Sequence, residues 1–222
     1  MLVRDSDTIF LVSVDPVLAR GDLRAVLARL RENWPPARLV RLLASPHCAV
    51  AKTAAVCLGL TGSMEHCPEL IALLGHADER VAAAAENGLW SVWMRAGSER
   101  GRAALMVAVQ RLRAGQIEAA LRLLRILVKV EGSFAEAHHQ QAIALHSLER
   151  CDEAEAAYQK TLGLNPYHFA AVAGLGHICV ERGDYAGALG HYRRAVQIHP
   201  RLAGVREIVP RLEAALERRV VA

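Results

Sequence analysis

Apolar residues follow a helical spacing over most of the chain, and the C-terminal end shows it most clearly. Val205, Val209, Leu212 and Leu216 lie four, three and four residues apart, with arginines and glutamates between them. Such a stripe predicts an amphipathic helix that covers the end of a helical array. Near the other end, residues 8–14 read TIFLVSV, which is β-branched and short for a helix. The structure of residues 1–20 is therefore open at this point.

The helical pattern repeats every 34 residues from residue 101 onward, in units 101–134, 135–168 and 169–202. The third unit carries small residues, rings and turn residues at the following places: Leu175, Gly176, Gly183, Asp184, Tyr185, Ala188, Tyr192, Ala195 and Pro200. At the turn glycine, the first unit keeps Gly115 and the second has Glu149. Because small residues let helices approach and glycine suits tight turns, the pattern predicts paired antiparallel helices.

A second period, of 31 residues, precedes the first. It aligns the pairs Leu42-Leu43 with Leu73-Leu74, Val50 with Val81, Ala54 with Ala85, and Leu58 with Leu89. We therefore divide residues 8–100 into units ending near 38, 69 and 100. The turns within these units are expected at Asp15-Pro16, Pro46-His47 and Ala77-Asp78, and the breaks between units at Pro35-Pro36, His66-Cys67 and Gly97-Ser98.

The 34-residue units resemble tetratricopeptide repeats, which have this length. The 31-residue units resemble the short HEAT-like repeats of the bacterial phycobilisome-lyase type. Together the resemblances imply an all-α fold, a right-handed α-solenoid with HEAT-like hairpins over 1–100, three tetratricopeptide units over 101–202 and a capping helix over 203–222. Because each repeat of such an array contacts mainly its neighbours, we expect 101–222 to fold as a domain by itself.

Composition agrees with a helical fold and narrows the partners. Hydrophobic residues make up 53% of the chain and aromatic residues 5%, which favours closely packed helices over sheets. The net charge is +4, but 27 basic residues are mixed with 23 acidic ones and form no long block, so nucleic acid is disfavoured as a partner. The start lacks the features of a signal peptide, no segment reaches the roughly 20 apolar residues that span a bilayer, and the five cysteines form no Cys-x-x-Cys pair. We expect a cytoplasmic protein with no membrane partner.

The motifs of common enzymes and metal sites are missing from the sequence. It has no glycine-rich phosphate loop, no nucleophile elbow and no His-Glu-x-x-His helix. His47-Cys48 and His66-Cys67 carry zinc-type donors, but a predicted helix would hold them roughly 24 Å apart. His139 and His146 share a helix face, yet two turns, roughly 10 Å, separate them. We expect no enzymatic activity, no cofactor and no metal.

In the tetratricopeptide family, the first helix of each unit lines a concave face. The resemblance implies a partner-binding groove formed by Leu105, Val109, Leu112, His139, Ile143, His146, Ala173, His177 and Val180. Chaperone-binding members grip a peptide's terminal carboxylate with Lys, Asn and Arg, but the matching positions here are Leu105, Val109, Gln140, Ala170 and Gly174. The resemblance therefore implies a groove for the nonpolar face of a helix or for an extended hydrophobic segment.

These observations favour a scaffold or adaptor that binds another protein or peptide. The first alternative is a regulatory or assembly subunit that binds copies of itself as a homo-oligomer. A helical-repeat nucleic-acid binder or a HEAT-like lyase is the third hypothesis. The sequence leaves open whether the HEAT-like or the tetratricopeptide face is the main binding surface.

Overall fold

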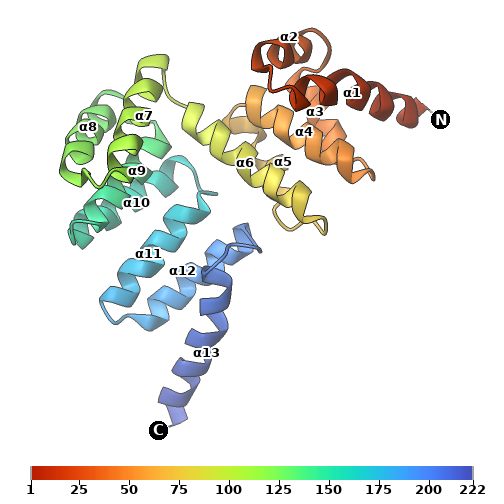
Figure 1. Ribbon diagram of the computed structural model, residues 1–222. Coiled ribbons are helices and arrows are strands. Elements are labelled where there is room, and N and C mark those ends of the chain that lie inside the picture. Colours follow the sequence, from red (N-terminus) through yellow and green to blue (C-terminus); the bar gives the residue numbers. More distant parts are fainter. Residues whose placement is uncertain (1, 222) are drawn as a thin grey trace. The chain divides into compact units, whose positions relative to one another are not determined.

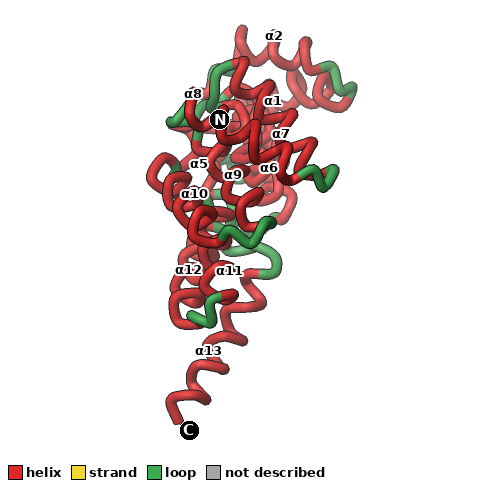
Figure 2. The backbone as a smooth tube through the Cα atoms, turned by 90° about the vertical axis from the view of Figure 1, so that its left-hand side faces the viewer, coloured by secondary structure: helices red, strands yellow, loops and turns green. Residues whose placement is uncertain are grey.

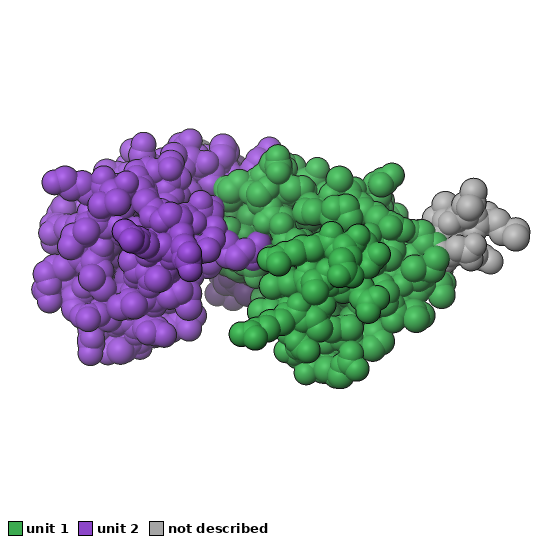
Figure 3. All heavy atoms as spheres, turned by 90° about the horizontal axis from the view of Figure 1, so that it is seen from above, with its two compact units in different colours: residues 1–93 green, residues 94–222 purple. Residues whose placement is uncertain are grey.

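A computed structural model describes the backbone of residues 2–221 and the side chains of residues 6–218. Every regular element in the described part of the chain is helical, as Figures 1 and 2 show. The chain divides into two compact units, residues 1–93 and 94–222 (Figure 3). The predicted all-α fold is confirmed. Within residues 2–221, no helix combines the length and the hydropathy needed to cross a membrane.

The first unit contains six α-helices and one 3₁₀ turn within its described residues. They are α1 (Leu2–Ala19), α2 (Leu23–Asn33), α3 (Pro36–Leu43), α4 (Cys48–Thr61), η1 (Met64–His66), α5 (Cys67–Ala72) and α6 (Glu79–Arg95), whose last two residues belong to the second unit. Helix α4 packs against α1, α2 and α3. The helices break at Pro35-Pro36, Pro46-His47 and Ala77-Asp78, where the 31-residue period predicts breaks.

The turn predicted at Asp15-Pro16 is wrong, because α1 continues through Pro16 to Ala19. The segment TIFLVSV lies inside this helix. Its helical form has a tertiary cause: Phe10, Val14 and Val17 follow the helical period and are buried. The Thr53 hydroxyl on α4 also donates a hydrogen bond to Asp15 Oδ1 over 2.8 Å. Burial along one face therefore outweighs the weak helix propensity of the β-branched residues.

Two glycines let α4 and α6 approach closely. A Cβ atom added to Gly59 would lie 2.6 Å from the Cα of Gly88, which is a backbone atom and cannot move aside. Gly88 in turn faces the backbone oxygen of Ala55 on α4. These two helices therefore pack backbone to backbone, and both positions require glycine.

The second unit consists of three helix pairs and a final helix. They are α7 (Glu99–Arg113), α8 (Ile117–Val130), α9 (Ala135–His146), α10 (Cys151–Leu164), α11 (Phe169–Glu181), α12 (Tyr185–Ile198) and α13 (Val205–Val221). Each helix packs against the next, and α9 also contacts both α7 and α11. The first helices of the pairs thus form one row of neighbouring helices (Figure 1).

Rings and glycines pack together both between repeats and within one repeat. A Cβ atom added to Gly174 would collide with the ring of Tyr158 in the preceding repeat. A Cβ atom added to Gly176 would lie 2.5 Å from the ring of Tyr192. The rings therefore occupy the space that the glycines leave.

The turns follow the same register. Gly115 and Gly183 have φ angles of 73° and 75°, in the left-handed region, and Glu149 has a φ of 58° at the equivalent place. After the last pair, α13 packs on α12 and covers an apolar cluster in which Val205 meets Tyr192. The predicted capping helix is confirmed.

Candidate functional site

The row formed by α7, α9 and α11 carries the residues predicted to bind a partner. Their side chains differ in exposure. Three of them are buried, namely Leu105 (0% exposed), His139 (4%) and Ala173 (6%). The remaining six are partly exposed or exposed: Val109, Leu112, Ile143, His146, His177 and Val180. These six residues, hereafter the inner face, are the accessible part of the predicted groove.

Polar groups lie at the ends of α9 and α11. His146 Nε2 is 2.8 Å from Glu181 Oε1, and the Cys151 thiol donates to Glu181 Oε2 over 3.3 Å. The hydroxyl of Tyr192 is 2.7 Å from His177 Nδ1. Burial and the hydrogen bond to Glu181 raise the pKa of Cys151. Cys151 is therefore a protonated thiol beside a carboxylate, which is not the arrangement that activates a cysteine nucleophile.

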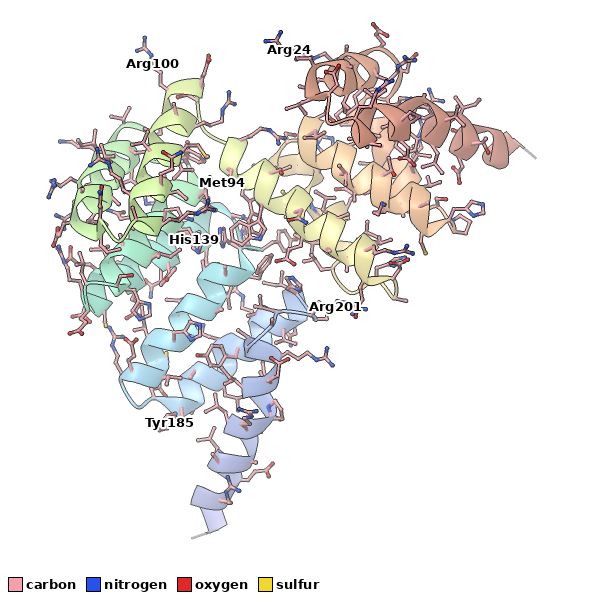
Figure 4. All side chains as sticks on the ribbon, viewed as in Figure 1. Arg24, Met94, Arg100, His139, Tyr185 and Arg201 are labelled. Carbon is pink, nitrogen blue, oxygen red and sulfur yellow. The ribbon has the colours of Figure 1, made fainter. Side chains whose placement is uncertain are left out.

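A second polar group is fully enclosed. Glu136, His139 and His168 are at most 4% exposed and join the first turn of α9 to the residue that precedes α11 (Figure 4 labels His139). His139 Nδ1 lies 3.1 Å from Glu136 Oε1, and His168 Nε2 lies 3.0 Å from Glu136 Oε2. The amide of Gln140 also donates to Glu136 Oε1, over 2.7 Å. A buried carboxylate thus accepts three hydrogen bonds from its neighbours.

A backbone hydrogen bond defines the proton position on His168. The backbone N–H of Ala171 donates to His168 Nδ1 over 3.2 Å, so the proton of His168 lies on Nε2 and is donated to Glu136. Burial would raise the pKa of Glu136, but the attraction of His139 and the hydrogen bonds of both histidines hold it below its ordinary value. Complete burial, together with repulsion from His139, lowers the pKa of His168 to about 4. His168 is therefore neutral at neutral pH.

The same three residues have donor atoms of the kind that bind zinc, and those atoms lie within 4.8 Å of one another. The ligating histidines of zinc sites usually donate their second ring N–H to an acceptor. Here the second ring nitrogen of His168 already accepts from Ala171. Binding of a metal at Nε2 would place a proton on Nδ1, facing the Ala171 N–H donor. The hydrogen-bond pattern therefore favours a structural network over a metal site.

The sequence pattern placed His139 in the predicted groove and did not single out His168. The alignment of the repeats does indicate that His168 is unusual. His168 ends the second unit, where the first and third units have the apolar residues Phe134 and Leu202. A histidine at an apolar position needs a polar partner, and Glu136 supplies it from the start of the same unit.

Comparison with protein families bears on these repeats directly. A family model described as "Tetratricopeptide repeat" matches residues 105–167 and 139–203. Residues 105–203 contain tetratricopeptide repeats. The matches begin at residue 105, so the HEAT-like character of residues 1–100 stays a prediction. No curated protein matches the chain.

Solved structures with a similar fold include several tetratricopeptide proteins. The first tetratricopeptide module of Spaghetti (RPAP3), bound to the HSP90 peptide SRMEEVD, has a TM-score of 0.52 and 15% identity over 55% of this chain and 96% of that one. The Yersinia enterocolitica type III secretion chaperone SycD, in complex with a peptide of the translocator YopD, has a TM-score of 0.48 and 14% identity over 55% and 93% of the two chains. YrrB, a tetratricopeptide protein with an unusual peptide-binding site, has a TM-score of 0.47 and 18% identity over 87% of each chain. At 15% identity the likeness to the RPAP3 module concerns the fold.

Proposed function

We propose that this chain is a non-enzymatic protein-interaction scaffold whose inner face binds a helical or extended apolar segment of another protein. The accessible apolar side chains along α7, α9 and α11 carry this proposal, with Ile143 of α9 on the middle helix of the row. Burying about 500 Å² of such a surface would contribute roughly 12 kcal/mol before the costs of association. A soluble protein that presents such side chains on neighbouring helices is suited to binding.

The composition of the face favours an apolar segment over an acidic peptide terminus. The RPAP3 module is bound to a peptide that ends in Glu-Glu-Val-Asp. At the positions where chaperone-binding members carry Lys, Asn and Arg, this chain has Leu105, Val109, Gln140, Ala170 and Gly174. These side chains supply no cation for a terminal carboxylate. A nonpolar helix face or an extended hydrophobic segment fits them better.

The test replaces Ile143 by Glu, which introduces a charge into the inner face. Circular dichroism first establishes that the variant is folded. Proteins retained from a native extract are then quantified, and the molar mass is measured by light scattering. We expect the variant to retain about tenfold less of at least one protein than the wild type, because burying an unpaired carboxylate opposes association. The molar mass of the variant should equal that of the wild type. Val12→Glu is the control, since Val12 is 71% exposed and lies in the first unit.

Other outcomes separate the alternatives. A wild-type oligomer that dissociates in the Ile143→Glu variant would favour a self-assembling subunit. Retention of nucleic acid that is lost at raised salt would favour the nucleic-acid hypothesis. If neither binding nor mass changes, the inner face is not the working surface, and residues 1–100 become the better candidate.

A further inference from the structure

The α7–α8 hairpin exposes several large apolar side chains. Met106 and Val107 on α7 are 49% and 44% exposed, and Ile126 and Val130 on α8 are 63% and 75% exposed. Ile126 and Val130 are four residues apart, so they form one stripe along α8. Single exposed apolar residues are normal on protein surfaces, but a grouped set indicates an interaction site.

Ile126 and Val130 line a hollow of about 200 Å³ between the two helices. Ala104 of α7 and Leu123, Ile126, Leu127 and Val130 of α8 line it, with Arg100, Gly101 and Glu131 at one end. The start of α7 lies beside the end of α8, because the helices are antiparallel (Figure 1). A trough between two antiparallel helices is the shape that receives a third helix.

The charges on this hairpin are one-sided. Residues 99–131 carry seven arginines and lysines but only three glutamates, which is a net charge equal to the +4 of the whole chain. Arg100 extends from the beginning of α7 (Figure 4), and Arg122 precedes Ile126 by four residues on the same stripe. Neither forms an ion pair within residues 6–218. A partner with acidic side chains would therefore meet two accessible cations.

The acidic residue that lines the hollow, Glu131, already forms hydrogen bonds within the unit. Glu131 accepts hydrogen bonds from the backbone N–H of Ser98 over 3.0 Å and from its hydroxyl. These hydrogen bonds from Ser98 lower the pKa of Glu131. Its carboxylate thus stabilises the start of α7 and leaves the two arginines to interact with other groups.

We propose that the hollow of the α7–α8 hairpin binds an amphipathic helix of another protein, with an apolar stripe in the hollow and acidic residues on Arg100 and Arg122. Because Arg100 lies near Val130 and eight residues separate Arg122 from Val130, the two cations are about 12 Å apart along the trough. The partner helix therefore carries acidic side chains about two turns apart.

The charges of this chain argue against a second copy as the occupant. The acidic run on α10 already pairs within the unit: Arg182 contacts Asp152 and Glu155, and Arg125 and Arg150 contact Glu153. Helix α13 mixes arginines with glutamates and has no acidic face. A membrane surface is also disfavoured, since Ile126 and Val130 line a hollow, whereas a membrane-binding face buries a projecting apolar surface in the bilayer.

The test uses two synthetic helical peptides of about 18 residues that share one leucine stripe. One has glutamates about two turns apart, and the other has lysines at those places. Fluorescence anisotropy measures their binding to the full chain. We expect the acidic peptide to bind at least about tenfold more tightly than the basic one, with an affinity that falls as salt is raised.

Variants locate the binding. Val130→Glu should weaken binding of the acidic peptide about tenfold and leave the melting temperature unchanged, because Val130 is 75% exposed. The matched control is Val12→Glu, a valine of similar exposure (71%), and it should leave the affinity unchanged. Ile143→Glu should also leave it unchanged, since this site does not depend on the inner face.

Four results would overturn the proposal. Equal binding of both peptides would remove the role of charge, and a lower melting temperature of Val130→Glu would show that the face is buried in the folded chain. If the Ile143→Glu variant no longer binds the acidic peptide, the peptide binds to the inner face. Binding to vesicles of phosphatidylcholine with about 30% phosphatidylserine, lost in Val130→Glu without any peptide binding, would identify a membrane surface.

Discussion

Glu149 occupies a turn position that favours glycine. Its φ of 58° lies in the left-handed region, where a Cβ atom costs roughly 1–2 kcal/mol, and the equivalent residues are Gly115 and Gly183. We predict that Glu149→Gly raises the free energy of unfolding by about 0.5–1 kcal/mol, because the relief of strain exceeds the added chain entropy of glycine. Urea unfolding measures this. Gly183→Ala is the matched control, and its free energy of unfolding should fall by about 1 kcal/mol. A Glu149→Gly variant that is less stable than the wild type would contradict the claim that the backbone is strained at Glu149.

The buried network should make stability depend on pH. His168 has its pKa lowered to about 4, below the roughly 6.5 of an unfolded chain, so the folded protein binds fewer protons between these values. Stability is then fully present above pH 6.5 and falls as the pH is lowered toward 4. We predict a loss of about 1–2 kcal/mol between pH 7 and pH 5, measured by urea unfolding at each pH.

The double variant Glu136→Leu/His168→Phe tests the origin of this dependence. It removes the buried carboxylate and its partner together, and Phe134 shows that an aromatic ring fits the equivalent position. His139 stays in the network of this variant, and the ring of Tyr158 contacts it. Part of the slope should remain, since burial lowers the pKa of His138, His177 and His191 as well. An unchanged slope would mean that His168 does not contribute.

At the scale of the helices, the contact of α4 with α6 depends on two glycines. A Cβ atom at Gly59 would lie 2.6 Å from the backbone of Gly88. We predict that Gly59→Ala lowers the free energy of unfolding by at least about 2 kcal/mol, because the helices must move apart. Gly190→Ala is the control: Gly190 lies inside α12 with no atom within 4 Å of an added Cβ, so alanine should stabilise by up to about 1 kcal/mol. Thermal unfolding compares the stability of the two variants. Equal changes in stability would contradict the close approach of α4 and α6.

Most helices follow from the sequence, and the exceptions have tertiary causes. The 34-residue register predicts the turn at Glu149, because turn residues recur at that place in all three units. The path of α1 through Pro16 could not be predicted, since it depends on burial of Phe10 and its neighbours against other helices. For the same reason the register predicted the inner row of helices but not the burial of Leu105 or the contact between Glu136 and His168, which are 32 residues apart.

At the scale of the whole chain, the second unit should fold without the first. We predict that residues 101–222 form a stable helical fragment, because each repeat packs mainly on its neighbours. A fragment of residues 94–222 should be more stable by about 1–2 kcal/mol. It retains Ser98, whose hydroxyl accepts from Gly101 N over 3.0 Å and caps α7. Circular dichroism and urea unfolding compare the fragments, and insolubility of both would show that the two units share a core.

The central claim is that the inner face of the tetratricopeptide repeats holds an apolar segment of another protein. The most direct measurement places a photo-crosslinking amino acid at position 143 of the full chain and, as a control, at position 12. After irradiation in a native extract, mass spectrometry identifies the adducts. We predict an adduct from position 143, absent from position 12, that joins this chain to an apolar segment of a different protein. Adducts only to this chain itself, or the same adducts from both positions, would contradict the claim.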